Sequence, residues 1–158
     1  QAIQGDSEVD LVAWKKRLET VNWNSGEAEA GEKLFIRRSC HSCHGSRGAL
    51  GPDLAGVSRR FSRQDLFTAI VAPNRDVSSR YRTLQVLTTT GRLYSGIVIY
   101  QSVDGVLLRT GSNETIRVEA EEMESQRYRS LSLMPRDLLR DFKNQDLADL
   151  DAYLRTLK

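Results

Sequence analysis

The chain has 158 residues, of which 39% are hydrophobic and 28% are charged, and its formal net charge is +2. This length and composition fit one globular domain, or one domain with an elaboration. No apolar run approaches the roughly 20 residues that a membrane-spanning helix needs, so no transmembrane segment is expected. The net charge is small and no basic stretch interleaves with aromatic residues, so no nucleic-acid partner is expected either.

The first predicted element is an amphipathic helix that begins after Asp6 or Ser7. Its buried face is expected to consist of Leu11, Trp14, Leu18 and Val21. These apolar residues recur at helical spacing, and the polar cluster at residues 22–26 ends the pattern. We expect residues 1–24 to form an N-terminal helix or linker.

Two further helices are predicted to cross closely. The first runs from about Glu27 to Arg38 and the second from about Asn144 to Leu157. Gly31 lies inside the first of them, where a glycine costs about 1 kcal/mol relative to alanine. A packing reason is therefore expected, and Tyr153 over the bare glycine would supply one.

The stretch that carries the chemistry is residues 39–45, SCHSCHG, which holds both cysteines and both histidines of the chain. Cys-x-x-Cys-His is the attachment motif of c-type haem. Cys40 and Cys43, three positions apart on one helical turn, can each form a thioether with one haem vinyl group. His44 then points its imidazole at the iron from the same side. The motif predicts one covalently attached haem c.

Two other readings of the motif stay open. A zinc site usually needs four nitrogen or sulfur ligands, and only Cys40, Cys43 and two crowded histidines are available. A dithiol redox site needs its cysteines beside a strand–helix–strand unit. The residues before Cys40 have a helical pattern instead, and such a site gives His44 no role.

A loop and a short helix follow the motif. Residues 45–54 contain three glycines and a proline, which suits a loop that wraps a flat ligand, with a plain turn as the alternative. Ser62 and Asp65 resemble a capping box. The helix that they begin is expected to end before Pro73.

The periodicity then changes from helical to alternating, which predicts β-strands. The expected strands are 82–88, 93–100, 106–110, 115–119 and a short fifth around 127–130. They form an antiparallel meander, inserted as residues 81–130 into a helical protein. Residues 25–80 and 131–158 remain as the haem core.

The ligand on the other side of the iron decides the chemistry. His41 lies between the two cysteines on the proximal side and cannot reach the distal face. Met123 and Met134 are then the remaining candidates, Met123 in an acidic, exposed strand entry and Met134 before Pro135, in the loop that leads to the last helix. An open iron, with Met134 as a core residue, is the alternative. A His/Met pair raises the reduction potential and saturates the iron, which suits electron transfer.

These features resemble class I c-type cytochromes, whose first and last helices cross through a glycine and aromatics. The resemblance implies that the carbonyl of Pro52 accepts the Nδ1–H of His44 and so orients the ring. It implies that Leu54 sits against the haem face and that Met134 is the distal ligand. The expected fold is mainly α: a cytochrome c-like helical haem domain at residues 25–158. A small antiparallel β-sheet is inserted between the third helix and the axial-methionine loop.

A narrower resemblance is to the haem-binding domain typical of planctomycete and verrucomicrobial proteins. It is carried by residues 40–44, 51–57, 60–62, 70–74, 91–96, 132–135 and 147–154. It implies an electron carrier rather than an enzyme, which accepts electrons from a fused dehydrogenase domain or a redox partner protein. It also implies a periplasmic or otherwise exported protein, whose signal or preceding domain is expected to be absent from this chain.

Three further hypotheses concern function. A haem enzyme or a gas or redox sensor is the alternative, because strand movement just before Met134 could open the distal site. The meander could instead serve partner docking. Ten lysines and arginines between residues 33 and 82, against three aspartates, could form a basic face that steers an acidic partner.

Overall fold

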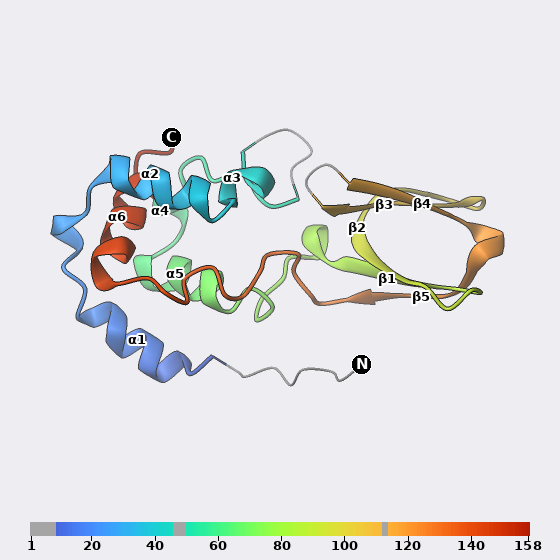
Figure 1. The fold of residues 1–158 in the computed structure, drawn as a ribbon, viewed down its shortest axis with the longest axis horizontal. Helices are drawn as coiled ribbons and strands as arrows, with labels where there is room; N and C mark the ends of the chain where they lie inside the picture. Colours follow the sequence, from blue (N-terminus) through green and yellow to red (C-terminus); the bar gives the residue numbers. More distant parts are fainter. Residues whose placement is uncertain (1–8, 46–49, 112–113) are drawn as a thin grey trace. The chain divides into compact units, whose positions relative to one another are not determined.

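A computed structural model describes residues 9–45, 50–111 and 114–158 (Figure 1). Its α-helices are α1 (Leu11–Glu19), α2 (Ala28–Arg37), α3 (Cys40–Cys43), α4 (Val57–Arg60), α5 (Arg63–Val71) and α6 (Asn144–Leu154). Its strands are β1 (Thr83–Thr88), β2 (Leu93–Ser102), β3 (Gly105–Gly111), β4 (Glu114–Glu119) and β5 (Met123–Arg129). Short 3-10 turns are η1 (Trp23–Ser25), η2 (Ser79–Tyr81) and η3 (Ala120–Glu122). Among the helices described, none is long and apolar enough to cross a membrane.

The chain forms two compact units. The helical unit contains α1, most of α2, α4, α5 and α6, and the sheet unit contains α3 and all five strands. The second unit is built around a five-stranded sheet, so the expectation of a mainly α protein is not confirmed. The motif turn and the axial-methionine loop are both grouped with the sheet, so the residues predicted as haem core fall in both units. That residues 25–158 act as one domain stays a prediction.

Helix α1 begins later than the sequence predicts. The side chain of Asp10 accepts hydrogen bonds from the N–H groups of Val12 and Ala13, both at 3.0 Å, and so caps the helix. Asp6 and Ser7 lie outside the described residues. Trp14 and Leu18 are buried, as the helical spacing predicts.

Helices α2 and α6 cross at van der Waals distance. A Cβ built on Gly31 would lie 2.0 Å from the carbonyl oxygen of Asp149 and 2.7 Å from the Cβ of Tyr153. The rings of Phe35 and Tyr153 pack one turn further on, with centroids 5.2 Å apart. Only a residue without a side chain fits at this crossing, which confirms the packing reason expected for Gly31.

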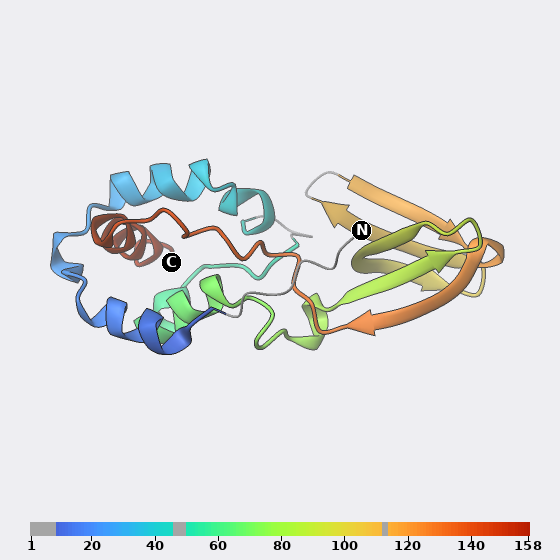
Figure 2. The ribbon, with the colours of Figure 1, turned by 60° about the horizontal axis from the view of Figure 1, so that its bottom comes forward.

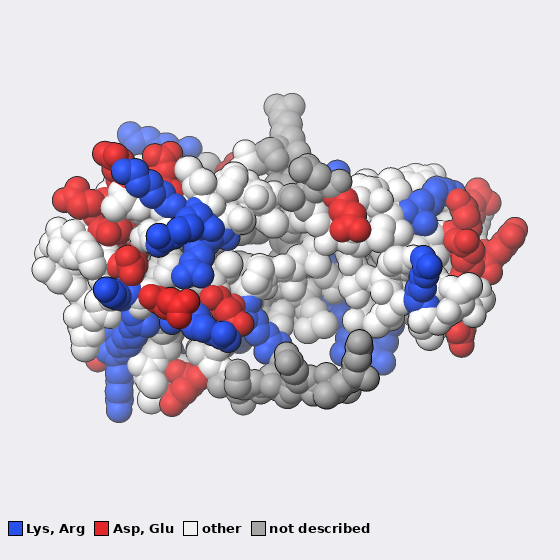
Figure 3. All heavy atoms as spheres, in the orientation of Figure 1, with Lys and Arg blue, Asp and Glu red and all other residues white. Residues whose placement is uncertain are grey.

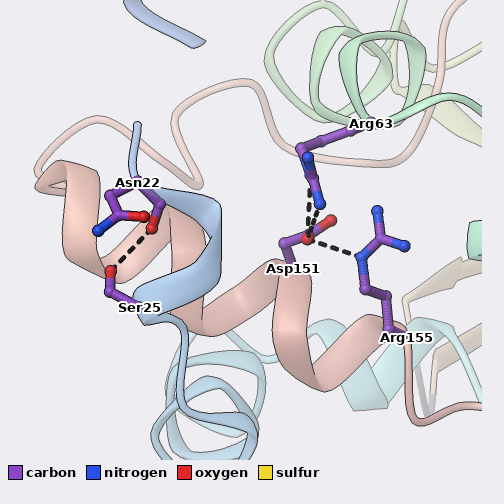
Figure 4. A network of polar contacts seen from close by, with 5 residues as sticks. All are labelled: Asn22, Ser25, Arg63, Asp151 and Arg155. Atoms are coloured by element: carbon purple, nitrogen blue, oxygen red, sulfur yellow. Dashed lines mark hydrogen bonds and ion pairs between the residues drawn. The ribbon is translucent and has the colours of Figure 1, made fainter. Parts of the chain in front are cut away.

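A buried carboxylate joins three elements of the helical unit. Asp151 of α6 is 2% exposed, and its Oδ2 accepts hydrogen bonds from Nε of Arg63 at 3.0 Å and Nε of Arg155 at 2.8 Å (Figure 4). The Arg63 guanidinium also lies 4.5 Å from the ring centroid of Trp23, whose ring packs on Phe67. Charge pairing and cation–π contact together tie η1, α5 and α6.

The sheet is antiparallel, with strand order β4-β3-β2-β1-β5. Strand β2 pairs with β1 through its first half and with β3 through its second half, with a register shift between Val98 and Tyr100. Strands β1 and β5 thus form one layer and β3 and β4 the other, with β2 curving between them (Figures 1 and 2). The buried side chains between the layers are Leu84, Val86, Val106, Leu108 and Val118. The predicted strands are confirmed, and β5 starts earlier, at Met123.

The position of Met123 differs from the expectation of an exposed strand entry. Met123 is half-buried and packs against the apolar core of the sheet. Its thioether therefore fills space in that core, where a flexible side chain suits an irregular gap.

The helix crossing yields a stability prediction. Gly31→Ala should lower the free energy of unfolding by about 1–3 kcal/mol or more, because the new methyl meets backbone atoms that cannot turn away. Chemical denaturation followed by far-UV circular dichroism measures this.

Gly111→Ala is the matched control. A Cβ there would lie 3.6 Å from the nearest described atom, which is ordinary contact, so little change is expected. Equal stability of both variants would contradict the crossing.

Candidate functional site

The motif residues form a separate helical turn because the backbone reverses just before them. Ser39 adopts φ 59° and ψ 22°, the left-handed conformation that ordinary residues seldom take. This ends the α2 direction and starts α3. The N–H of His44 donates to the carbonyl of Cys40 at 2.9 Å. Cys40, Cys43 and His44 are thereby held on one turn, the arrangement that the spacing predicts.

The loop after the motif returns to that turn and is tied to it twice. The N–H of Gly51 donates to the carbonyl of Cys43 at 3.0 Å. Nδ1 of His44 lies 2.7 Å from the carbonyl oxygen of Pro52. Residues 46–49, between these points, lie outside the described residues. The two contacts fix the end of the loop directly beside the imidazole.

The contact with Pro52 sets the tautomer and direction of His44. A carbonyl oxygen only accepts, so a 2.7 Å contact requires the proton on Nδ1. Nε2 then carries the free lone pair, the form in which histidine binds a metal. The hydrogen bond to the carbonyl also makes the imidazole a stronger donor to a metal.

Gly51 allows this arrangement and was not singled out from the sequence. A Cβ on Gly51 would lie 2.6 Å from Cε1 of His44 and 2.9 Å from its Nδ1. Such distances are shorter than van der Waals contact, so the loop can cover the ring only with glycine there. The glycine-rich composition of the loop is the signal, but it does not say which glycine meets the histidine.

Both cysteines are half-buried, and they form no disulfide with each other. Burial raises the pKa of the Cys40 thiol above its ordinary value, while the positive charge of Arg38 acts against that rise. Burial likewise raises the pKa of Cys43. Reactive dithiols have lowered pKa values instead, so the surroundings do not suit a thioredoxin-type site.

A zinc site finds no support in the part of the chain that the structure describes. No group of three or more His, Cys, Asp or Glu side chains lies close enough to hold a metal ion there. Two thiols and one oriented imidazole on a single turn instead suit a haem. The porphyrin nitrogens would supply the other ligands of its iron, so few protein ligands are needed. The residues present therefore fit haem c.

The loop with the predicted distal ligand has its own polar contacts. The N–H of Met134 donates to Oγ of Ser132 at 3.1 Å, and the N–H of Ser132 donates to Oδ1 of Asn74 at 2.8 Å. Met134 is half-buried. Its role as a ligand stays a prediction. Asn74 lies in a motif that supports the family resemblance, yet its contact across the insertion could not be read from the sequence.

The remaining predicted site residues are placed as follows. Leu54 is half-buried and Pro52 is exposed. The position of Leu54 against a haem face stays a prediction. His41 is exposed between the two cysteines.

Two comparisons bear on this site. The family model described as Cytochrome c matches residues 28–86. The matched range includes the motif turn, Gly51 and Pro52 and ends before Met134. A search of curated proteins finds no match to this chain.

The contact between the loop and the ring yields a second prediction. Gly51→Ala should push the imidazole of His44 away from Pro52 and weaken their hydrogen bond. A weaker hydrogen bond makes the imidazole a poorer donor to the iron, which favours the reduced state. If this costs the oxidised state about 1 kcal/mol, the reduction potential of the haem-loaded protein rises by about 40 mV. Redox titration followed by absorbance measures the shift.

Gly111→Ala again serves as the control, since its substitution lies in β3 and meets nothing closely. A potential that is unchanged in Gly51→Ala would show that the Pro52 contact does not tune His44.

Proposed function

We propose, from the premise that residues 28–86 are those of a c-type cytochrome, that this protein is a single-haem electron-transfer module with His44 and Met134 as axial ligands. The family implies haem c attached through two cysteines, and this chain has two, Cys40 and Cys43. When bound, the haem supplies a one-electron iron couple.

The observation that carries the proposal is the 2.7 Å contact between His44 Nδ1 and the Pro52 carbonyl. It supports an imidazole that carries a proton on Nδ1 and is held in one orientation, with Nε2 directed away from the carbonyl. Gly51 lets the loop lie close to the ring, since a Cβ there would lie 2.6 Å from Cε1 of His44. A ligand that does not move keeps the reorganisation small, which electron transfer needs.

Two observations support Met134 as the opposite ligand. Met123, the other methionine, packs against the core of the sheet. Met134 lies in a loop whose backbone is tied to Ser132 and, through it, to Asn74. A thioether on the sixth position leaves no site for oxygen or peroxide and favours a carrier over an enzyme.

The place of the carrier follows from the same proposal. A cytochrome c domain is in general an electron carrier, and covalent haem attachment is typical of exported proteins. We infer a periplasmic or otherwise exported protein that accepts electrons from a dehydrogenase, either a redox partner or a domain of the same polypeptide. The narrower resemblance to planctomycete and verrucomicrobial domains supports the fused arrangement.

An absorption spectrum of the haem-loaded chain tests the axial ligands. The ferric protein should be low-spin and show the far-red sulfur-to-iron band, and cyanide and carbon monoxide should bind slowly. Met134→Ala should abolish the band, lower the potential and open the site to both ligands.

Met123→Leu is the control for the loss of a thioether, and it should keep the band. A wild-type protein that is high-spin and binds carbon monoxide at once would favour the alternative, a haem enzyme or sensor with an open distal site.

Charge suggests how a partner docks. Figure 3 shows acidic side chains gathered at the end of the sheet unit around η3. They are the exposed residues Asp104, Glu119, Glu121, Glu122 and Glu124. In the same unit Arg37 and Arg75 are exposed near the motif turn and before β1, whereas Arg63 of the helical unit is paired with buried Asp151. We infer that Arg37 and Arg75 contribute to a basic face for an acidic partner.

The ionic strength tests this face. Electron transfer from an acidic redox protein should slow as salt rises from about 10 mM to about 200 mM, because screening shortens the reach of charge. The double substitution Arg37→Gln and Arg75→Gln should reduce the rate and its salt dependence.

Lys15→Gln, on the exposed side of α1, is the control and should change neither. A rate that is independent of salt in the wild-type protein would remove the basic-face hypothesis.

A further inference from the structure

A bridge of two hydrogen bonds closes the base of the sheet. Asn74 lies just after buried Pro73, where the chain leaves α5, and Ser132 lies just after β5, where the chain leaves the sheet. Their contact, 2.8 Å from the Ser132 N–H to the Asn74 Oδ1, joins residues 58 positions apart. The same Ser132 accepts the N–H of Met134 through its hydroxyl at 3.1 Å. The segment that enters the sheet, with Asn74, and the segment that leaves it, with Ser132, are here called the entry and exit segments. The Asn74 side chain thus holds the exit segment two residues before Met134.

From this bridge we propose that Asn74 is a positioning residue for Met134, and that it keeps the distal loop in the ligating conformation independently of the sheet. The inference rests on the proposed His44/Met134 ligation and deepens it. All of β1 to β5 lies between Asn74 and Ser132, so a bond between these two residues closes the insertion at its base. Movement of the strands is then not passed on to the methionine.

The chemistry of the bridge explains why asparagine suits this position. The Ser132 N–H is part-buried and has Oδ1 of Asn74 as its acceptor. Removal of that oxygen leaves a part-buried donor unpaired, which destabilises this conformation of the loop. The unpaired donor lies two residues before Met134, in a loop that Pro135 already stiffens. The loop would relax by moving, and the sulfur would move with it.

The bridge also bears on the alternative function. A displaceable distal ligand needs a loop that strand movement can pull. The hydrogen bond to Asn74 anchors the loop with Ser132 and Met134 to the segment before β1. The loop is then held at a second point besides its covalent link to β5. Asn74 is therefore the residue whose loss would convert a closed electron-transfer site into a displaceable one.

The experiment compares Asn74→Ala, Asn74→Asp and the wild-type haem-loaded chain. Asn74→Ala should weaken the far-red band, speed cyanide binding by about fivefold, and speed amide hydrogen exchange at Ser132 by about tenfold, as loss of one part-buried hydrogen bond implies. Asn74→Asp keeps an acceptor oxygen of the same reach and should restore all three readouts. Ser132→Ala, which removes only the acceptor of the Met134 N–H, should speed cyanide binding in the same direction.

Asn24→Ala, at an exposed asparagine of η1, controls for a general loss of stability and should leave every readout unchanged. The inference is overturned if Asn74→Ala keeps the band, the cyanide rate and the exchange rate of the wild type. It is also overturned if Asn74→Asp behaves like Asn74→Ala, since the acceptor oxygen would then be irrelevant. A wild-type chain without the far-red band would overturn the His/Met ligation itself, and this outcome is visible before any variant is made.

Discussion

The contact between the His44 ring and the Pro52 carbonyl is the interaction on which the proposed chemistry of this protein depends. It selects the tautomer with the proton on Nδ1, leaves Nε2 free to bind a metal and makes the imidazole a stronger donor. It is possible because Gly51 presents no side chain to the ring, and because the left-handed Ser39 turns the motif out of α2. A local reversal, a bare glycine and one carbonyl together convert a short motif into an oriented ligand.

The helices and the sheet contribute in different ways. In the helical unit, the crossing at Gly31 and the buried charge of Asp151 hold α2, α5 and α6 together. The sheet has an apolar core of its own, made by side chains of β1, β3 and β4. Because Met123 packs against that core, Met134 is the methionine that the proposed ligation assigns to the iron. The packing of the insertion therefore supports this assignment.

The Cys43–His44 turn and the Met134 loop are both held by hydrogen bonds to another segment of the chain. That segment is near in sequence for the turn and far in sequence for the loop. The Cys43 and His44 turn is tied to a loop that returns eight residues later, and the Met134 loop is tied to a segment 58 residues earlier. Each tie joins a side chain of one segment to a backbone group of another, so each fixes one part of the chain against another. Under the proposed ligation, both axial side chains would belong to segments that are held in place, as electron transfer with little structural change requires.

The sequence by itself determined the motif turn and most elements of secondary structure. Cys40, Cys43 and His44 lie within one helical turn, so their spacing is a local property. The change from helical to alternating periodicity marked the five strands. The expectation of a mainly α fold was not confirmed, because the strands form a second compact unit with its own apolar core. Asp10, rather than an earlier residue, caps α1. Gly51 against the ring, Met123 in the sheet core and Asn74 on Ser132 were decided by tertiary structure alone, since each depends on which segments meet in space and no periodicity or spacing records that.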